Sequence, residues 1–311
     1  MQRHTVGFMG GNQRGNLYVA ITNLDNNGVV KGNQDFYKRL STQINASYKI
    51  KKWLNVGTTN AIERYSYNSV SEGSEYGSLI ASALVMDPLT PAYYTADNLP
   101  QFMLDKIAAG KKYLTDEYGR YYSVSQFNQF NDSHPLIQRD NHESTNNGIN
   151  VLGTIYTDLS PLKGLMYTSK LGYRMSYSNS SNYQFPYYVD EQIFNNNYQI
   201  SGTLSNSLYY QWENYVTYMF NLGEHNFTAM SGMSFIHSNS NYITGSGDEL
   251  KGYEPNFRYL SYMTSGCNDS VSGLPSESAS ISYFGRLSWS FRDTYMLQTI
   301  FRADAYDSSK L

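Results

Sequence analysis

Alternation of apolar and polar residues is clearest between Ser280 and Arg302. Successive side chains of a β-strand point to opposite faces, so a period of two predicts strands with one apolar and one polar face. Arg292 and Asp293 interrupt the pattern and predict a short turn. One face of this predicted hairpin carries Tyr283, Leu287, Trp289, Phe291, Tyr295, Leu297 and Phe301, and the other carries Arg286, Ser288, Ser290, Gln298 and Arg302. The segment therefore predicts a hairpin of a half-buried sheet.

The same alternation recurs along the chain and predicts about ten strands, which short turns join in pairs. Long polar segments at 68–148, 179–204 and 239–279 separate the pairs and are predicted to be loops. Tight turns then lie on one rim of the sheet and long loops on the other. Bacterial outer-membrane barrels have short periplasmic turns and long extracellular loops, whereas soluble sandwiches distribute loops between both ends. The pattern favours an all-β, antiparallel transmembrane β-barrel segment with extracellular loops.

Two short helices are predicted within the 68–148 segment. Residues Leu79–Met86 carry apolar side chains at helical spacing before a proline. Residues Pro100–Ala109 form the second predicted helix, with Asn98 as its cap and Gly110 as its stop. A connection of this length inside a compact domain is usually functional. We therefore look for binding residues here.

Composition narrows the class of protein. The chain of 311 residues has 31 Tyr against 14 Phe and 3 Trp, and tyrosine suits strands, membrane interfaces and sugar stacking. A net charge of −3 provides no basic surface for nucleic acid, and a single cysteine, Cys267, excludes an internal disulfide framework. The sequence contains no apolar run of about 18 residues, so it predicts no transmembrane helix. Hydropathy does not exclude a barrel, whose outward and inward residues alternate.

No arrangement of residues predicts catalysis. The five histidines are scattered and none belongs to a metal-binding pattern. His134 and His142 flank Asp140, but a solvated polar loop explains this arrangement better than a metal site does. We expect a protein that is not an enzyme and that has no cofactor and no metal.

Tyrosine pairs in the predicted loops are the candidate substrate-binding residues. Tyrosine stacks on the apolar face of a sugar ring and hydrogen-bonds its hydroxyls without needing charge. The alternative is that these tyrosines pack the long loops against one another, which we favour for any single pair. The candidates are Tyr93, Tyr94, Tyr121, Tyr122, Tyr187 and Tyr188.

Four stretches, in the same order along the chain, carry a resemblance to a known family. They are GGN at 10–12 with the strands of 16–57, MDPLTPAYY at 86–94, HPLIQRDN to LSPLKGL at 134–165, and YFGRLSWSFRDTYMLQTIFRAD at 283–304 followed by SSKL. Together they resemble the SusC/RagA-type TonB-dependent transporters of Bacteroidetes outer membranes. The motifs belong to barrel strands rather than to a catalytic site.

The resemblance implies a barrel of roughly 22 strands around an N-terminal plug. It also implies TonB-driven import of oligosaccharides or peptides under a SusD-like surface lipoprotein, in the outer membrane of a Gram-negative bacterium. About ten strands cannot close such a barrel, and lipid does not tolerate open sheet edges. We therefore expect residues 1–311 to be the central part of one receptor barrel domain, with the plug, through which TonB would act, and the C-terminal strands lying outside it.

The polar face of the predicted sheet would then point into the barrel lumen. Lys170, Arg174, Arg286 and Arg302 lie on it and are expected to pair with plug carboxylates, with contact to an anionic substrate as the alternative. The loop tyrosines favour glycan uptake as the function, and a peptide importer of the same architecture is the first alternative. A soluble secreted carbohydrate-binding protein or adhesin is the alternative from a different class.

Overall fold

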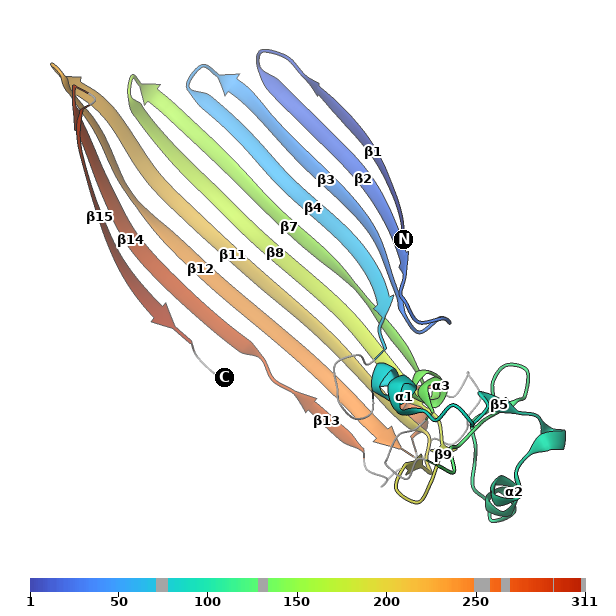
Figure 1. Ribbon diagram of the computed structural model, residues 1–311. Coiled ribbons are helices and arrows are strands. Elements are labelled where there is room, and N and C mark those ends of the chain that lie inside the picture. The colour runs from blue at the N-terminus through green and yellow to red at the C-terminus, as the bar shows by residue number, and fades with distance from the viewer. Residues whose placement is uncertain (71–77, 128–133, 249–257, 264–268, 293, 309–311) are drawn as a thin grey trace.

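The computed structural model describes residues 1–311 except 71–77, 128–133, 249–257, 264–268, 293 and 309–311. Ten long strands form one antiparallel sheet in the order β1-β2-β3-β4-β7-β8-β11-β12-β14-β15, and the short β13 (Ser270–Gly273) pairs with β12 (Figure 1). This confirms the all-β prediction and its strand number. The long strands are β1 Gln2–Gly11, β2 Gly15–Asn27, β3 Phe36–Lys51, β4 Leu54–Asn68, β7 His142–Leu162, β8 Leu165–Gln184, β11 Gln199–Leu222, β12 His225–Asp248, β14 Ser276–Phe291 and β15 Tyr295–Asp307.

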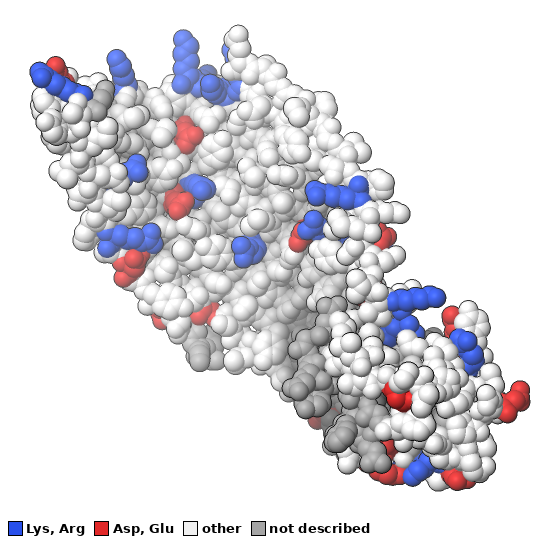
Figure 2. All heavy atoms as spheres, in the orientation of Figure 1, with Lys and Arg blue, Asp and Glu red and all other residues white. Residues whose placement is uncertain are grey.

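All five tight turns lie on one rim of the sheet, as the sequence predicts (Figure 1). Gly164 and Gly223 adopt positive φ angles of 80° and 61° in two of them, which glycine adopts without a steric penalty. Backbone hydrogen bonds join successive turns, for example 2.7 Å from the Lys49 nitrogen to the Arg14 oxygen and 2.8 Å from the Met219 nitrogen to the Gly164 oxygen. In Figure 2, Lys and Arg side chains stand along this tight-turn rim.

The strand register fixes which residues share a face, because residues directly opposite one another on antiparallel strands lie on the same side. One row crosses five strands through Ile155, Leu171, Trp212, Phe235 and Ile281. We call the side that carries this row the apolar face and the other side the polar face. The polar face of β14 carries Ser278, Ser280, Ser282, Ser288 and Ser290, and register places Lys170, Arg174, Arg286 and Arg302 on that same face.

An aromatic belt lies on the apolar face beside the tight-turn rim. Phe220 stacks on Phe227 with ring centroids 5.0 Å apart, and His225 stacks on Phe291 at 4.6 Å. The Trp289 Nε1 donates a hydrogen bond of 3.0 Å to the His225 Nδ1, so the indole N–H is satisfied within the sheet. Aromatic girdles of this kind mark the interfaces of transmembrane barrels.

Four strands extend farther than the apolar pattern predicts. Residues 142–148, 179–184, 199–204 and 239–248 are strand rather than loop, and β14 already begins at Ser276. The two strands β11 and β12 have 24 residues each, well beyond the roughly 9–11 that span a bilayer. Apolar side chains are sparse in these extensions, with Tyr183, Ile200, Leu204, Tyr242 and Ile243 as exceptions, so the alternation is hard to recognise while backbone pairing continues. The predicted loop boundaries were therefore wrong by several residues.

The opposite rim carries the long connections and their short elements, α1 (Leu79–Val85), α2 (Gln101–Ala108), α3 (Pro135–Asp140) and the two-residue strands β5, β6, β9 and β10 (Figure 1). We call the described residues of 69–141 and 185–198 the loop cap. The first two helices confirm the prediction, although Pro100 rather than Asn98 occupies the N-cap of α2. Helix α3 was not predicted. Cys267 and Asp293 lie outside the described residues.

The two edges of the sheet are formed by β1 and β15, which are not paired with each other in the part of the chain that the structure describes. Every other long strand has a neighbour on both sides. Among the described residues no helix combines the length and the apolar character needed to cross a membrane.

Leu171, 38% exposed on the apolar face, tests the assignment of that face to lipid. We expect Leu171→Lys to cost roughly 2–4 kcal/mol of folding free energy in a bilayer, because a lysine at mid-depth would be held in hydrocarbon. Urea unfolding of the protein in phospholipid vesicles measures this cost.

Thr154→Lys is the matched control, because Thr154 pairs with Gly172 at the same depth but on the polar face. It should fold with nearly unchanged stability. Equal destabilisation by the two lysines would contradict the assignment of the apolar face to lipid.

Candidate functional site

The loop cap brings the three tyrosine pairs of the sequence together. Strand β5 (Tyr93–Tyr94) pairs antiparallel with β6 (Tyr121–Tyr122), and β9 (Tyr187–Tyr188) pairs with β10 (Phe194–Asn195). Neighbouring residues of a strand point in opposite directions. Each pair therefore sends one tyrosine into each of two small hydrophobic cores.

The first core is built around buried Met103, Tyr113 and Tyr188, with Tyr94 and Tyr121 packed against it. The second is built around buried Tyr122, Ile137 and Val189, with Tyr93 and Tyr187 at its margin. Only 1% of Tyr122 and 3% of Tyr188 is exposed, so these two rings pack the loops together. Substrate binding by the half-exposed Tyr93, Tyr94, Tyr121 and Tyr187 stays a prediction.

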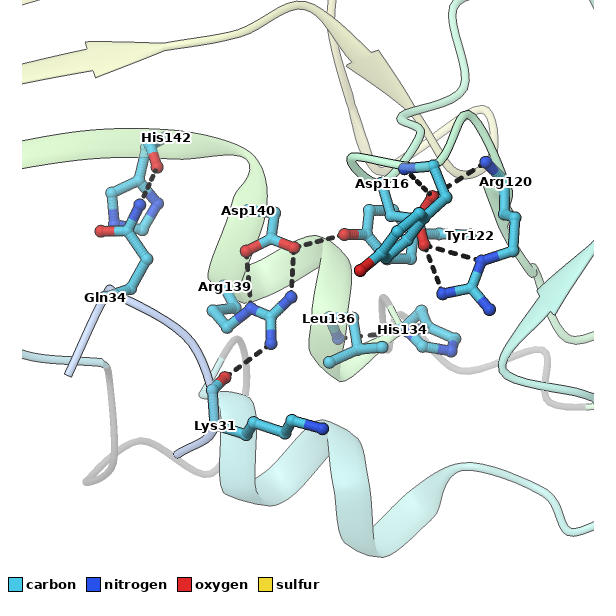
Figure 3. Close-up of polar contacts among 11 residues, drawn as sticks. Lys31, Gln34, Asp116, Arg120, Tyr122, His134, Leu136, Arg139, Asp140 and His142 are labelled. Atoms are coloured by element: carbon cyan, nitrogen blue, oxygen red, sulfur yellow. Dashed lines mark hydrogen bonds and ion pairs between the residues drawn. The ribbon is translucent and has the colours of Figure 1, made fainter. Parts of the chain in front are cut away.

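A partly buried chain of polar contacts ties the second core to a neighbouring connection (Figure 3). The Tyr122 hydroxyl donates to Asp140, and the Arg139 Nε donates to the same carboxylate at 2.6 Å. The Arg139 guanidinium also donates 2.6 Å to the carbonyl of Lys31, between β2 and β3. Burial and the Asp140 hydrogen bond raise the pKa of Tyr122, so its hydroxyl stays protonated as the donor. The chain orients α3 against the sheet rim.

Arg120 secures the start of β6. Its Nε donates 2.8 Å to the Asp116 carboxylate, which also accepts the backbone N–H of Arg120 and of Tyr118 (Figure 3). The guanidinium carbon lies 4.1 Å from the Tyr93 ring centroid, within cation–π range. One residue therefore joins the turn to the β5–β6 ladder.

His134 is the N-cap of α3 rather than a metal ligand. Its Nδ1 accepts a 3.1 Å hydrogen bond from the Leu136 N–H, and Pro135 occupies the first turn (Figure 3). Burial lowers the pKa of His134 to about 4, which keeps the ring neutral. His142 instead contacts Asn141, 2.7 Å from its Nδ1. Across the described ranges no three His, Cys, Asp or Glu side chains gather at one point.

A pocket of about 310 Å³ opens beside the first core. Tyr121, a predicted candidate, lines it together with Lys111 and Lys112, which sequence reasoning did not single out. The Lys111 ammonium lies 5.0 Å from the Tyr188 ring centroid, and the Lys112 ammonium lies 5.8 Å from that of Tyr198. Neither lysine forms an ion pair with a described residue. Two lysines directly before a tyrosine, at 111–113, were the one sequence signal that could have indicated this pocket.

The predicted lumen-facing residues lie on the strands, apart from this pocket. Lys170 reaches Glu213 at 3.8 Å, and Arg302 donates 2.8 Å to Asp304 and 3.1 Å to Ser282. Arg286 keeps a buried Nε without a hydrogen-bond partner among the described residues. Two of the four cations are therefore matched by carboxylates of the sheet itself. Pairing with a plug stays a prediction.

Structural comparison finds the same fold within solved transporters and import receptors. A chain of the RagAB peptide transporter matches 98% of this chain with a TM-score of 0.74 and 18% identity. The RagAB peptide importer in its closed-closed state gives the same values. The ferric-catecholate import receptor Fiu of E. coli K12 matches 98% of this chain with a TM-score of 0.54 and 7% identity. The ferric preacinetobactin receptor BauA of Acinetobacter baumannii matches 99% of this chain with a TM-score of 0.52 and 10% identity.

The chain spans 32% and 31% of the two RagAB chains, 42% of Fiu and 41% of BauA. At these identities the likeness establishes the fold alone. No protein-family model and no curated protein matches this chain by sequence. The predicted barrel-segment fold is thus confirmed, and activity has to be argued from the residues.

The neutral cap residue His134 makes the loop cap sensitive to acid. Because its folded pKa of about 4 lies below the unfolded value of 6.5, the unfolded state takes up a proton first as the pH falls. The contribution of His134 to loop-cap stability should be complete above pH 6.5, fall by about 3 kcal/mol between pH 6.5 and 4, and level off below that. Amide hydrogen exchange of α3, corrected for intrinsic rates, measures it.

His134→Asn is the control variant, since asparagine caps a helix but does not titrate. It should retain α3 and remove the His134 part of the pH dependence, leaving the part due to His142, whose pKa burial also lowers. If loop-cap stability depended on pH as steeply in this variant as in the parent protein, a group other than His134 would be responsible.

Proposed function

We propose that this chain forms part of the wall and outer loops of a TonB-dependent outer-membrane importer for short oligomeric nutrients, with peptides as the favoured substrate. The observation that carries the proposal is the continuous apolar face of a ten-strand meander, with tight turns on one rim and the loop cap on the other. This arrangement is typical of transmembrane barrels.

Exposure of the apolar face argues against a soluble carbohydrate-binding protein or adhesin. Trp212, Ile155 and Leu287 are 47%, 49% and 44% exposed, and they belong to one contiguous side of the sheet. A soluble protein rarely leaves an apolar surface of this extent open to water. Inside a membrane the open edges at β1 and β15 need partner strands, so we assign the sheet to the wall of a larger barrel.

Two lysines in an aromatic pocket favour a peptide. A terminal or side-chain carboxylate can accept hydrogen bonds from Lys111 and Lys112 while apolar side chains pack on Tyr121 and Phe185. A neutral glycan has no carboxylate with which these ammonium groups could form charge-paired hydrogen bonds. The fold most similar to this chain among those compared above belongs to a peptide transporter, which agrees with this choice.

Oligosaccharide import is the second candidate, favoured by the tyrosines. Tyr121 and Tyr198 line the pocket with rings that can stack on sugars. Under either substrate the mechanism is capture beneath a SusD-like surface lipoprotein, followed by passage when TonB acts on a plug. No bond is made or broken, so the protein is not an enzyme.

Titration of the purified outer-membrane complex with short peptides tests the substrate. We expect the double variant Lys111→Gln, Lys112→Gln to weaken binding of peptides with a free C-terminal carboxylate roughly tenfold or more, because charge-assisted hydrogen bonds are lost. Peptides with an amidated C-terminus should bind both proteins equally. Isothermal titration calorimetry measures the affinities.

Lys163→Gln, on the tight-turn rim, is the control and should leave peptide binding unchanged. Binding of neutral oligosaccharides with no peptide binding would select the glycan alternative. A protein that is folded and monomeric in detergent-free buffer would refute the membrane proposal altogether.

A further inference from the structure

One half of the tight-turn rim carries unbalanced positive charge. Arg14 lies in the β1–β2 turn, Lys51 and Lys52 lie at the β3–β4 turn, and Lys163 lies in the β7–β8 turn. All four are exposed, and none forms an ion pair with a residue that the structure describes. The hairpins are neighbours in the sheet, so successive turns stand roughly 10 Å apart.

The other half of the rim differs. There Arg292 of the β14–β15 turn pairs with Glu224 of the β11–β12 turn, and its charge is neutralised. The aromatic belt covers the apolar face below these two turns. Among the described residues of the tight-turn rim, Lys and Arg side chains without an ion-pair partner thus lie on the β1–β8 half.

A groove of about 530 Å³ lies below the basic turns. Its side chains belong to the apolar face, because register aligns Leu17, Ala46, Thr58 and Ile155 in one row across four strands. The small Ala46 and Thr58 form the floor of the groove. Leu17, Tyr48, Val56 and Ile155 form its walls.

Groove and charge lie within one lipid length of each other. Ala46 and Tyr48 precede Lys51 by five and three residues on β3, which corresponds to roughly 10–17 Å along the strand. An acyl chain in the groove would therefore place its headgroup at the lysines. The lining is mainly apolar, although Asn12, Asn16, Ser47 and Thr58 also contribute to it, and it therefore suits hydrocarbon.

We propose that this half of the rim binds one anionic phospholipid, with an acyl chain over Ala46 and Thr58 and its phosphate held by Lys51, Lys52, Arg14 and Lys163. The proposal rests on the proposed membrane location. Tight turns of bacterial barrels face the periplasmic side, and phospholipid is the membrane component whose negative headgroup and hydrocarbon chain match both parts of the site. Bound lipid would orient the β1–β8 part of the wall in the membrane.

Native mass spectrometry of the purified protein tests the proposal. The protein is released from nanodiscs that contain equal amounts of phosphatidylglycerol and phosphatidylethanolamine. We expect one retained phosphatidylglycerol, with roughly fivefold lower retention for each of Lys51→Gln, Lys52→Gln and Lys163→Gln. Ala46→Phe should fill the groove and abolish retention without removing any charge.

Two control variants separate the site from general effects. Ala229→Phe adds the same ring to the apolar face of β12, close to the same rim, and Arg292→Gln removes a rim charge that is already paired. Both should retain phosphatidylglycerol like the parent protein.

The possible results are distinct. Equal retention of both phospholipids, retention of lipopolysaccharide in their place when it is added, or no retained lipid in a protein that inserts normally into nanodiscs would overturn the lipid site while leaving the importer proposal intact. Failure to insert into nanodiscs at all would overturn the importer proposal, and the lipid site would fail with it.

Discussion

Backbone hydrogen bonding between neighbouring strands is the constraint on which this structure depends, and it is strictest in the membrane location proposed above. In hydrocarbon every N–H and C=O needs a partner from another strand, so only a continuous sheet of neighbouring antiparallel strands is permitted. The meander satisfies this rule for eight of its ten long strands by giving each a partner on both sides. The period-two alternation follows from the same rule, because a strand that is paired on both edges can differ only between its two faces. Among the described long strands, only β1 and β15 keep an unpaired edge.

The constraint also decides where recognition can take place. Strands that must pair along their full length have little freedom to shape a pocket, whereas the long connections are free to fold on their own. The loop cap does so with two small cores, each taking one ring from every tyrosine pair. Burial of Tyr122 and Tyr188 holds the connections in place, and the Arg139–Asp140–Tyr122 chain attaches them to the β2–β3 connection. Lys111, Lys112 and Tyr121 line a pocket of about 310 Å³ on this scaffold.

The charges on the strands and on the tight-turn rim follow the same division. On the strands, Lys170 and Arg302 are balanced by carboxylates of the polar face, because an unpaired charge beside a low-dielectric wall is costly. In the proposed membrane location the tight-turn rim would contact headgroups and water, where lysines without a protein partner are tolerated. Their concentration over the β1–β8 hairpins, above a groove of small residues, makes the two halves of the rim chemically different.

Much of the fold was determined by the sequence alone. Alternation predicted the strands, the five tight turns, both faces and the placement of Lys170, Arg174, Arg286 and Arg302 on one face, because period two is a local property. Helix α3 escaped prediction because its six residues are too few for a periodic signal, and the strand extensions escaped because apolar residues are sparse in them. Only the tertiary structure placed the three tyrosine pairs, separated by up to 95 positions, in shared cores. It also brought Lys111 and Lys112 beside Tyr121 at one pocket, and it aligned Ala46 with Thr58 beneath Lys51. Contacts between distant segments depend on register and loop packing, which no single stretch of sequence encodes.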